Sequence, residues 1–327
     1  MERSTGIDGL RNLPPKAVIS IGNFDGFHRG HAHIVETMKG LRTDGATPLA
    51  IVTFEPHPLT VLRPEAVPPR LTPPELKREL LEAAGITHLV ELPPSHDVLD
   101  LSAEAFWAIL RDETRPSYIV EGATFNFGKG RSGTIERLRE WAANSSVRLI
   151  EVGSVSAALL DLTVAPISSS VIRWLLQNGR VRDAGIALGR AYVLRGPVVK
   201  GFQRGRTIGV PTANFDVIGQ LVPADGVYAG RVVVNGIGYP AAVSIGTMPT
   251  FEGTRRQIEA HLIGFDGDLY DRTLDLELID WVRDQYKFPG IESLKRQLAR
   301  DIKEAVVRVE HVRAGRPTAR VEVGQSA

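Results

Sequence analysis

The residues with the clearest chemical character lie in one short stretch, from Ile21 to His31. Its two histidines, His28 and His31, stand three residues apart, which lets both imidazoles face one side of a single helical turn. Gly22 and Gly26 let the backbone turn sharply and approach a ligand closely. Imidazoles can donate hydrogen bonds to the charge that develops during phosphoryl or nucleotidyl transfer. The stretch therefore predicts a site for a phosphate-bearing ligand.

Two other interpretations also fit these histidines. They could be solvent-facing side chains on an ordinary turn between a strand and a helix. They could also be a pair of zinc ligands, although zinc would need further His, Cys or carboxylate ligands and the chain contains no Cys. The combination of glycines, an aspartate and two histidines at one turn favours the phosphate site.

A second chemical stretch spans residues 201–214. Its three glycines would let a loop fold over phosphates with its backbone N–H groups inward, and its two arginines add positive charge. A threonine hydroxyl and an asparagine amide oxygen at its end are hard ligands suited to Mg²⁺. The plainer alternative is a glycine-rich hairpin connection. The residues concerned are Gly201, Arg204, Gly205, Arg206, Gly209, Pro211, Thr212 and Asn214.

A phosphoryl transfer to an alcohol also needs a group that accepts the hydroxyl proton. The run Ile258–Leu262 alternates apolar and polar residues, so Glu259 and His261 share one face of an expected strand. Glu259 is the candidate base, and the alternative is a solvated strand carboxylate.

Two further segments have phosphate-binding features. Ser169, Ser170 and Arg173 place hydroxyls at a helix start with a guanidinium one turn on, although such serines often only cap the helix. The loop 122–133 is not a P-loop, because Ala123 and Gly130 occupy positions that the motif reserves for other residues. Its last six residues fit the weak dinucleotide pattern G-x-G-x-x-G, which leaves NAD binding as an alternative.

These motifs resemble known families. The opening stretch is similar to the nucleotidyltransferase signature, whose histidines contact the nucleotide triphosphate. Loop 122–133 resembles the loop that lines the nucleotide and flavin site of bacterial FAD synthetases, and the serine–arginine segment resembles the one that grips ATP phosphates there. The resemblance implies these site residues in the first half: Gly22, Asn23, Phe24, Asp25, Gly26, His28, His31, Thr124, Phe125, Phe127, Gly128, Ser169, Ser170 and Arg173.

The stretch 201–214 closely resembles the riboflavin kinase signature, with Val210 where phenylalanine is usual. The resemblance implies that Gly201, Gly205, Arg206, Gly209 and Pro211 belong to the ATP loop. It also implies that Thr212 and Asn214 hold the metal and that Glu259 is the catalytic base. Both signatures occur in the order found in bifunctional prokaryotic riboflavin kinase/FAD synthetases.

The resemblance implies two reactions that use ATP and Mg²⁺. Riboflavin would be phosphorylated to FMN, and FMN would be adenylylated to FAD with release of pyrophosphate. One alternative is a monofunctional riboflavin kinase whose first domain only binds nucleotide or flavin, because Thr124 and Pro166 depart from the family pattern. Another is a flavin-sensing module without catalysis.

The elements that must position these residues fall into two groups. In the first half, strands are expected over 17–21, 48–54, 87–92, 117–121 and 147–152, with helices over 32–39, 72–84, 102–110 and 134–143. Such alternation predicts a doubly wound parallel sheet, which binds ligands at the carboxyl ends of its strands.

From about Ala191 the pattern changes to strands without intervening helices, over 191–195, 227–234, 239–245, 257–263 and 273–282. Asn235 and Gly236 are a strong hairpin signal. We expect an antiparallel β-barrel followed by a helix from Gly290. The predicted domains are 1–186 (adenylyltransferase), 187–313 (kinase barrel) and a disordered tail, 314–327.

Composition limits the function classes. The 327 residues carry a formal net charge of +1, which gives no global argument for nucleic-acid or membrane-surface binding. No apolar run is long enough for a signal peptide or a membrane span, and the absence of Cys suits a reducing compartment. We expect a cytoplasmic enzyme of small-molecule substrates, with no nucleic-acid or membrane partner. The oligomeric state does not follow from the sequence.

Overall fold

The structure, a computed structural model, describes residues 1–42, 45–201, 205, 209–250, 253–313 and 321–323. The chain forms two compact units, each described below by itself. The first comprises Met1–Pro68, Pro74–Ser156 and Val321–Ala327, and the second Pro69–Pro73 and Ala157–Arg320. Helices α8 (Ser169–Gln177) and α9 (Val181–Leu188) share the apolar core of the second unit. The predicted boundary at residues 186–187 separates two domains of different activity, and it stays a prediction.

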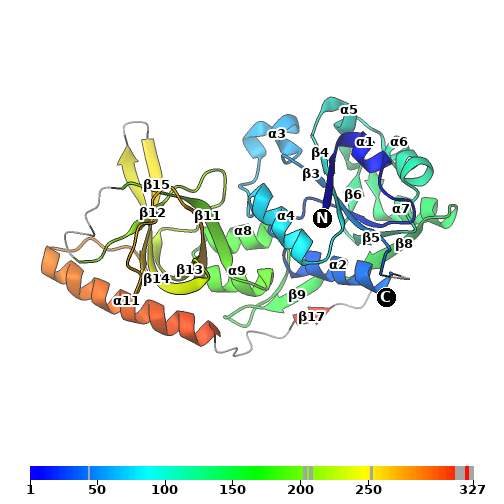
Figure 1. The fold of residues 1–327 in the computed structure, drawn as a ribbon. Helices are drawn as coiled ribbons and strands as arrows, with labels where there is room; N and C mark the ends of the chain where they lie inside the picture. The colour runs from blue at the N-terminus through cyan, green and yellow to red at the C-terminus, as the bar shows by residue number, and fades with distance from the viewer. Residues whose placement is uncertain (43–44, 202–204, 206–208, 251–252, 314–320, 324–327) are drawn as a thin grey trace. The chain divides into compact units, whose positions relative to one another are not determined.

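The first unit contains a six-stranded sheet of order β1-β4-β3-β2-β5-β8 (Figure 1). All of its neighbouring strands are parallel, as the alternating pattern predicts. The chain moves from β2 towards β3 and β4 on one side and to β5 and β8 on the other, so the strand order reverses between β2 and β5. Its strands are β1 (Glu2–Thr5), β2 (Val18–Ile21), β3 (Leu49–Phe54), β4 (His88–Leu92), β5 (Tyr118–Gly122) and β8 (Arg148–Val152).

Helices cover both faces of this sheet because its strands are apolar on both sides. On one face, Val35 and Met38 of α2 (Arg29–Gly40) and Leu81 of α4 (Pro74–Ala83) join the core with Val18 and Ile51. The other face packs on α1 (Gly6–Arg11), α6 (Ala103–Ala108) and α7 (Ile135–Ala143) (Figure 1). This is the doubly wound arrangement that the sequence predicts.

Several short elements complete the first unit and lead into the second. They are α3 (Leu59–Leu62), η1 (Pro64–Ala66), α5 (His96–Leu99), η2 (Ile109–Thr114), β6 (Asn126–Phe127), η3 (Lys129–Arg131), β7 (Gly133–Thr134), β9 (Val155–Ala158), β10 (Val164–Pro166) and β17 (Val321–Val323).

The second unit contains a closed antiparallel barrel of order β11-β12-β15-β14-β13-β16, in which β16 also pairs with β11. The predicted hairpin is confirmed, because Asn235 and Gly236 both adopt positive φ between β13 and β14. The strands are β11 (Tyr192–Val199), β12 (Ala213–Phe215), β13 (Gly226–Val234), β14 (Ile237–Thr250), β15 (Gly253–Leu262) and β16 (Thr273–Arg283).

Helix α11 (Ile291–Arg313) lies along the outside of the barrel (Figure 1). Its buried Ala305 and Val309 pack against Ala229 and Ile279 of the barrel wall. The predicted disorder of residues 314–327 falls largely outside the described residues, and β17 (Val321–Val323) is the described part of that segment.

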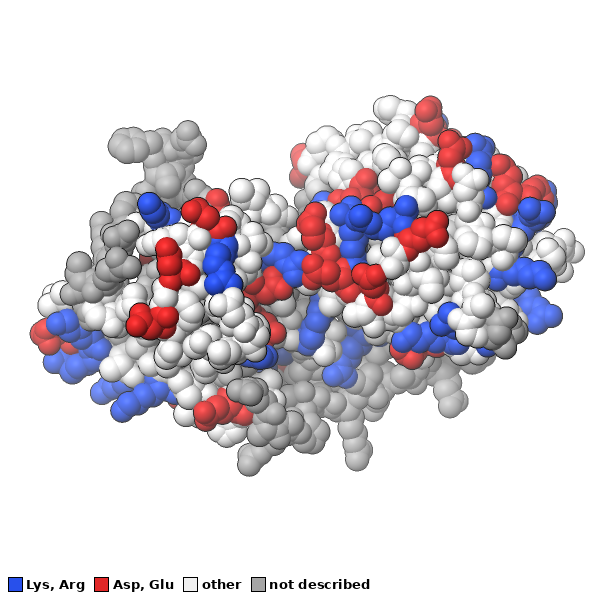
Figure 2. Space-filling view, in the orientation of Figure 1, with Lys and Arg blue, Asp and Glu red and all other residues white. Residues whose placement is uncertain are grey.

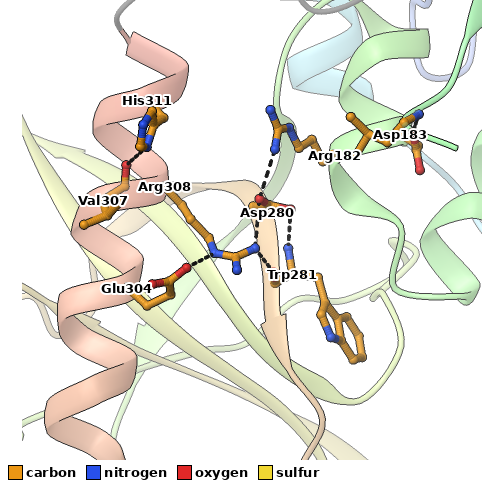
Figure 3. A network of polar contacts seen from close by, with 9 residues as sticks. Arg182, Asp183, Asp280, Trp281, Glu304, Val307, Arg308 and His311 are labelled. Atoms are coloured by element: carbon orange, nitrogen blue, oxygen red, sulfur yellow. Dashed lines mark hydrogen bonds and ion pairs between the residues drawn. The ribbon is translucent and has the colours of Figure 1, made fainter. Parts of the chain in front are cut away.

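An ion-pair network centred on Asp280 joins three elements of the second unit (Figure 3). Asp280 accepts hydrogen bonds from Arg308 of α11 at 3.0 Å and from Arg182 of α9 at 3.5 Å. Its other oxygen accepts the backbone N–H of Trp281 at 2.9 Å. The carboxylate thus links both helices to the barrel strand β16.

We expect Asp280→Asn to lower the free energy of unfolding by about 2 kcal/mol, because it removes the shared negative charge between two guanidinium groups. The effect stays below that of a fully buried pair, since Arg182 and Arg308 remain partly exposed. Urea unfolding measures it. Glu292→Gln, which removes the exposed pair with Lys295 on the same helix, should change the stability by less than about 0.5 kcal/mol. Equal effects of both substitutions would contradict the role of Asp280.

Acidic and basic side chains are interspersed over the face of the molecule in Figure 2, with broad uncharged areas between them. That face shows no extended surface of a single sign. The mixture agrees with the near-zero net charge of the sequence.

Candidate active sites

His28 and His31 lie at the start of α2, next to the carboxyl end of β2. The helix begins at Arg29, three residues earlier than predicted, because the ring of His28 caps it: Nδ1 accepts the backbone N–H of His31 at 3.3 Å. The two rings stack with their centroids 3.6 Å apart. Since Nδ1 of His28 accepts, the ring carries its proton on Nε2.

His31 is held as a neutral imidazole. Burial, followed by the electrostatic effects of His28 and Lys77, lowers the pKa of His31 well below the ordinary value. Its Nδ1 is buried and has no hydrogen-bond partner among the described residues. Buried polar atoms are nearly always paired, so an unpaired one beside a helix N-terminus is a natural point for a ligand to bind.

The turn before the helix is built on positive φ angles at Phe24 and Gly26. The Phe24 ring is 1% exposed and packs 4.8 Å from the His31 ring, centroid to centroid. The carbonyl of Asn23 accepts a hydrogen bond from the Thr53 hydroxyl at 3.2 Å. Phe24 therefore supports the turn from inside the core, while Asn23 is exposed and Asp25 is half-buried.

Two charged groups that sequence reasoning missed lie in this unit. Lys77 of α4 is 4% exposed and forms a 3.0 Å ion pair with Glu55, which follows β3. Its charge acts on His31, as the lowered pKa of that imidazole records. A lysine at a core-facing position of an amphipathic helix was the available sequence signal.

Glu121 of β5 lies where the strand order reverses, the point at which such sheets bind ligands. The β2–β5 ladder pairs Val18 with Tyr118 and Ile19 with Ile119. Beyond it the Glu121 carboxylate accepts the backbone N–H of Ile21 at 2.6 Å and the Ser20 hydroxyl at 3.5 Å. The side chain, 3% exposed, thus anchors the strand end that leads into Gly22.

Burial raises the pKa of Glu121 well above its ordinary value, and the bonds from Ile21 and Ser20 oppose that rise. The folded state then binds more protons than the unfolded state between the ordinary and the raised pKa, so stability falls as pH rises through that window. A glutamine side chain at this position would be neutral throughout. We expect Glu121→Gln to raise the melting temperature more at pH 8 than at pH 5, measured by thermal unfolding. Parallel pH profiles of the two proteins would contradict it.

Loop 122–133 contributes its two phenylalanines to the core of the first unit. Phe127 is buried against Phe106 and Trp141, and Phe125 stacks on Phe127 at 5.4 Å between centroids. Gly128 has a positive φ, and a Cβ there would lie 2.6 Å from the Ala103 nitrogen, so only glycine fits. Thr124 is exposed. The flavin and nucleotide contacts of this loop stay predictions.

Ser169, Ser170 and Arg173 lie in the first turns of α8, in the second unit. The cap is the preceding serine, Ser168, whose hydroxyl accepts the backbone N–H of Val171 at 3.3 Å. Arg173 donates to the Pro69 carbonyl at 2.7 Å. The hydroxyls of Ser169 and Ser170 are therefore not needed to cap the helix, and their role towards phosphates stays a prediction.

The second predicted site lies on the outer face of the barrel. Glu259 of β15 stands opposite Asn214 of β12 and Ser244 of β14, while Ile258 and Ala260 point into the core. His261 Nδ1 lies 2.7 Å from the Pro211 carbonyl, so the ring can donate to it and fix the segment that carries Thr212. Asn214 and Glu259 are thus register partners on adjacent strands, and the roles of Pro211, Asn214 and Glu259 stay predictions.

Backbone and side-chain crowding explains why glycine occupies two positions of this site. A Cβ on Gly201 would lie 2.4 Å from the Asn214 amide nitrogen, and a Cβ on Gly205 would lie 2.2 Å from the Val210 carbonyl oxygen. Gly209 has φ +83°. Arg204 and Arg206 lie outside the described residues.

The zinc alternative gains no support within the described ranges, where no three His, Cys, Asp or Glu side chains gather to hold a metal ion. In the same part of the chain, no helix is both long enough and apolar enough to cross a bilayer.

Comparison with known proteins covers both units. A family model for FAD synthetase matches residues 10–169, and one for riboflavin kinase matches residues 188–308. A bifunctional riboflavin kinase/FMN adenylyltransferase of Bacillus subtilis is 34% identical over 302 residues, which are 91% of this chain and 94% of that protein. The chain belongs to this bifunctional family.

A family member from Escherichia coli K12 is 33% identical over 92% of this chain and 96% of its own length. Among solved structures, one titled a macrolide-efflux protein from Streptococcus pneumoniae superposes with a TM-score of 0.81 at 29% identity. The superposition covers 93% of this chain and 98% of the Streptococcus pneumoniae chain. The two chains therefore share their fold.

Proposed function

We propose that this chain carries out two consecutive reactions of flavin cofactor biosynthesis. The barrel unit transfers the γ-phosphoryl group of ATP to the ribityl 5′-hydroxyl of riboflavin, which yields FMN and ADP. The adenylyltransferase half joins FMN to the AMP portion of ATP, which yields FAD and pyrophosphate. The observation that carries the proposal is the full-length match to bifunctional relatives together with the preserved chemistry of both signatures.

In the kinase reaction Glu259 accepts the proton of the attacking hydroxyl and holds that hydroxyl in line. Asn214, its register partner on β12, and Thr212 are the oxygen donors for a divalent metal. A hydroxyl and an amide oxygen fit Mg²⁺ rather than a softer metal. When bound, the metal neutralises charge on the transferred phosphates.

In the adenylylation the FMN phosphate is itself the nucleophile, so no protein nucleophile is needed. His28 and His31 donate hydrogen bonds to the triphosphate as pyrophosphate departs, and the N-terminus of α2 adds its N–H groups. Ser169, Ser170 and Arg173 are the further residues proposed for ATP phosphates. The loop that contains Thr124, Phe125, Phe127 and Gly128 is proposed to line the flavin or nucleotide site. The proposed location is the cytoplasm, and the proposed partners are ATP, riboflavin and FMN.

The direct test is incubation of the purified protein with riboflavin and Mg-ATP, followed by chromatographic separation of the flavins. We expect FMN to appear first and FAD to follow. FMN alone would support the monofunctional kinase, and the absence of any phosphorylated flavin would support a flavin-sensing module.

A further inference from the structure

Gln257 lies two residues before Glu259 on the same outer face of β15. It is half-buried, and neither the kinase signature nor the metal-binding residues include it. Its side-chain nitrogen Nε2 lies 2.7 Å from Oδ1 of Asn214 and 2.8 Å from Oε1 of Glu259. A single amide therefore touches both the proposed metal ligand and the proposed base.

The chemistry of these groups fixes the direction of both bonds. An ionised carboxylate can only accept hydrogen bonds, so Gln257 must turn its NH₂ group towards Glu259. That NH₂ has two hydrogens, and the second points to Asn214, which must then present its oxygen rather than its nitrogen. The orientation of both amides follows from the one carboxylate.

The Asn214 amide is closely packed. The side chain is 8% exposed, and an added Cβ on Gly201 would lie 2.4 Å from its nitrogen Nδ2 and 2.6 Å from its oxygen Oδ1. Packing thus confines the amide group, and the hydrogen bond from Gln257 sets which end is the oxygen. The oxygen Oδ1 has two acceptor positions, and Gln257 occupies one of them. The other is the position that a cation would occupy.

We propose that Gln257 is a positioning residue of the kinase site, which holds the metal-binding oxygen of Asn214 and the carboxylate of Glu259 in one arrangement. The proposal rests on the function proposed above. Without Gln257, the Asn214 amide can rotate and offer NH₂ to the metal, and Glu259 loses the 2.8 Å hydrogen bond to its Oε1. Outer-shell partners of this kind typically contribute 10- to 100-fold in metal affinity or activity.

The test uses Gln257→Met, which keeps the length of the side chain and removes the donor. We expect about 10-fold weaker Mn²⁺ binding in the presence of ADP, measured by electron paramagnetic resonance without turnover. We also expect a 10- to 100-fold lower kcat for riboflavin phosphorylation that excess Mg²⁺ partly restores, with the riboflavin Kd unchanged. Gln297→Met is the matched control, since it removes one 2.8 Å bond to Asp301 on α11.

Gln257→Leu is the second variant, because it is neutral, close to glutamine in size and has no hydrogen-bond donor. It should show the same weakening if Gln257→Met does not fold. Wild-type Mn²⁺ affinity and kcat in either folded variant would overturn the inference. Glu259→Gln distinguishes a failure of the proposed function from a failure of this inference. Full activity in Glu259→Gln would contradict the proposed base. An inactive Glu259→Gln together with a normal Gln257→Met would contradict only the role of Gln257.

Discussion

Glu259→Gln should lower the rate of FMN formation by about 10²-fold or more, while FMN-to-FAD conversion stays near normal. General-base catalysis typically contributes 10²- to 10⁴-fold. The substitution is structurally mild, because the amide oxygen can still accept the 2.8 Å bond from Gln257. What it loses is the capacity to take the proton of the attacking hydroxyl. Steady-state kinetics of each half-reaction, started from riboflavin or from FMN, measure the two effects separately.

The matched control is Glu277→Gln on β16, another half-buried strand carboxylate of the barrel, 3.4 Å from Arg231. It should leave both rates near wild type. Retention of most kinase turnover in Glu259→Gln would identify Glu259 as a surface carboxylate, with the base elsewhere.

His31→Ala should lower the rate of FAD formation by about 10²-fold or more, the scale of losing one preorganised donor. The buried, unpaired Nδ1 of His31 and its stacking on His28 indicate a ring held ready for a ligand rather than a solvated side chain. FMN affinity should change little, because the proposed contact is with the phosphates of ATP. Riboflavin phosphorylation should be unaffected, since the kinase residues belong to the other unit.

His33→Ala, the same substitution two residues along α2, is the control and should have little effect on FAD synthesis. Equal loss of both activities in His31→Ala would indicate unfolding, which thermal melting detects. Unchanged FAD synthesis would make the opening stretch a structural turn and remove the basis for the adenylyltransferase site.

The architecture could be predicted from sequence because its signals are local. Continuous apolar runs, such as the one around Ile51 in β3, mark strands that are buried on both faces. Alternation of apolar and polar residues, as in Ile258–Leu262, marks a barrel strand with one face exposed to solvent. The Asn235 and Gly236 hairpin depends on the positive φ that those two residues tolerate. Motif spacing then placed the candidate chemistry at strand ends and turns.

The rest depended on contacts between distant residues. Nothing near His28 in the sequence shows that its ring, rather than a serine or aspartate, caps α2. The bond from Ile21 to Glu121 spans 100 positions, and that from Gln257 to Asn214 spans 43. Such pairs become visible only once the sheet and the barrel bring their strands together. The periodicity of apolar residues also predicted the start of α2 three residues too late, because it reflects the apolar stripe of the helix and not its cap.

The central claim is that two independent sites act in sequence through FMN. Mixing the two purified variants, Glu259→Gln and His31→Ala, with riboflavin and Mg-ATP tests it most directly. Each variant alone should form little FAD: the first makes little FMN, and the second accumulates FMN. The mixture should form FAD at a substantial rate, because FMN released by His31→Ala is a substrate for Glu259→Gln. A mixture that forms no more FAD than the two variants separately would contradict the account.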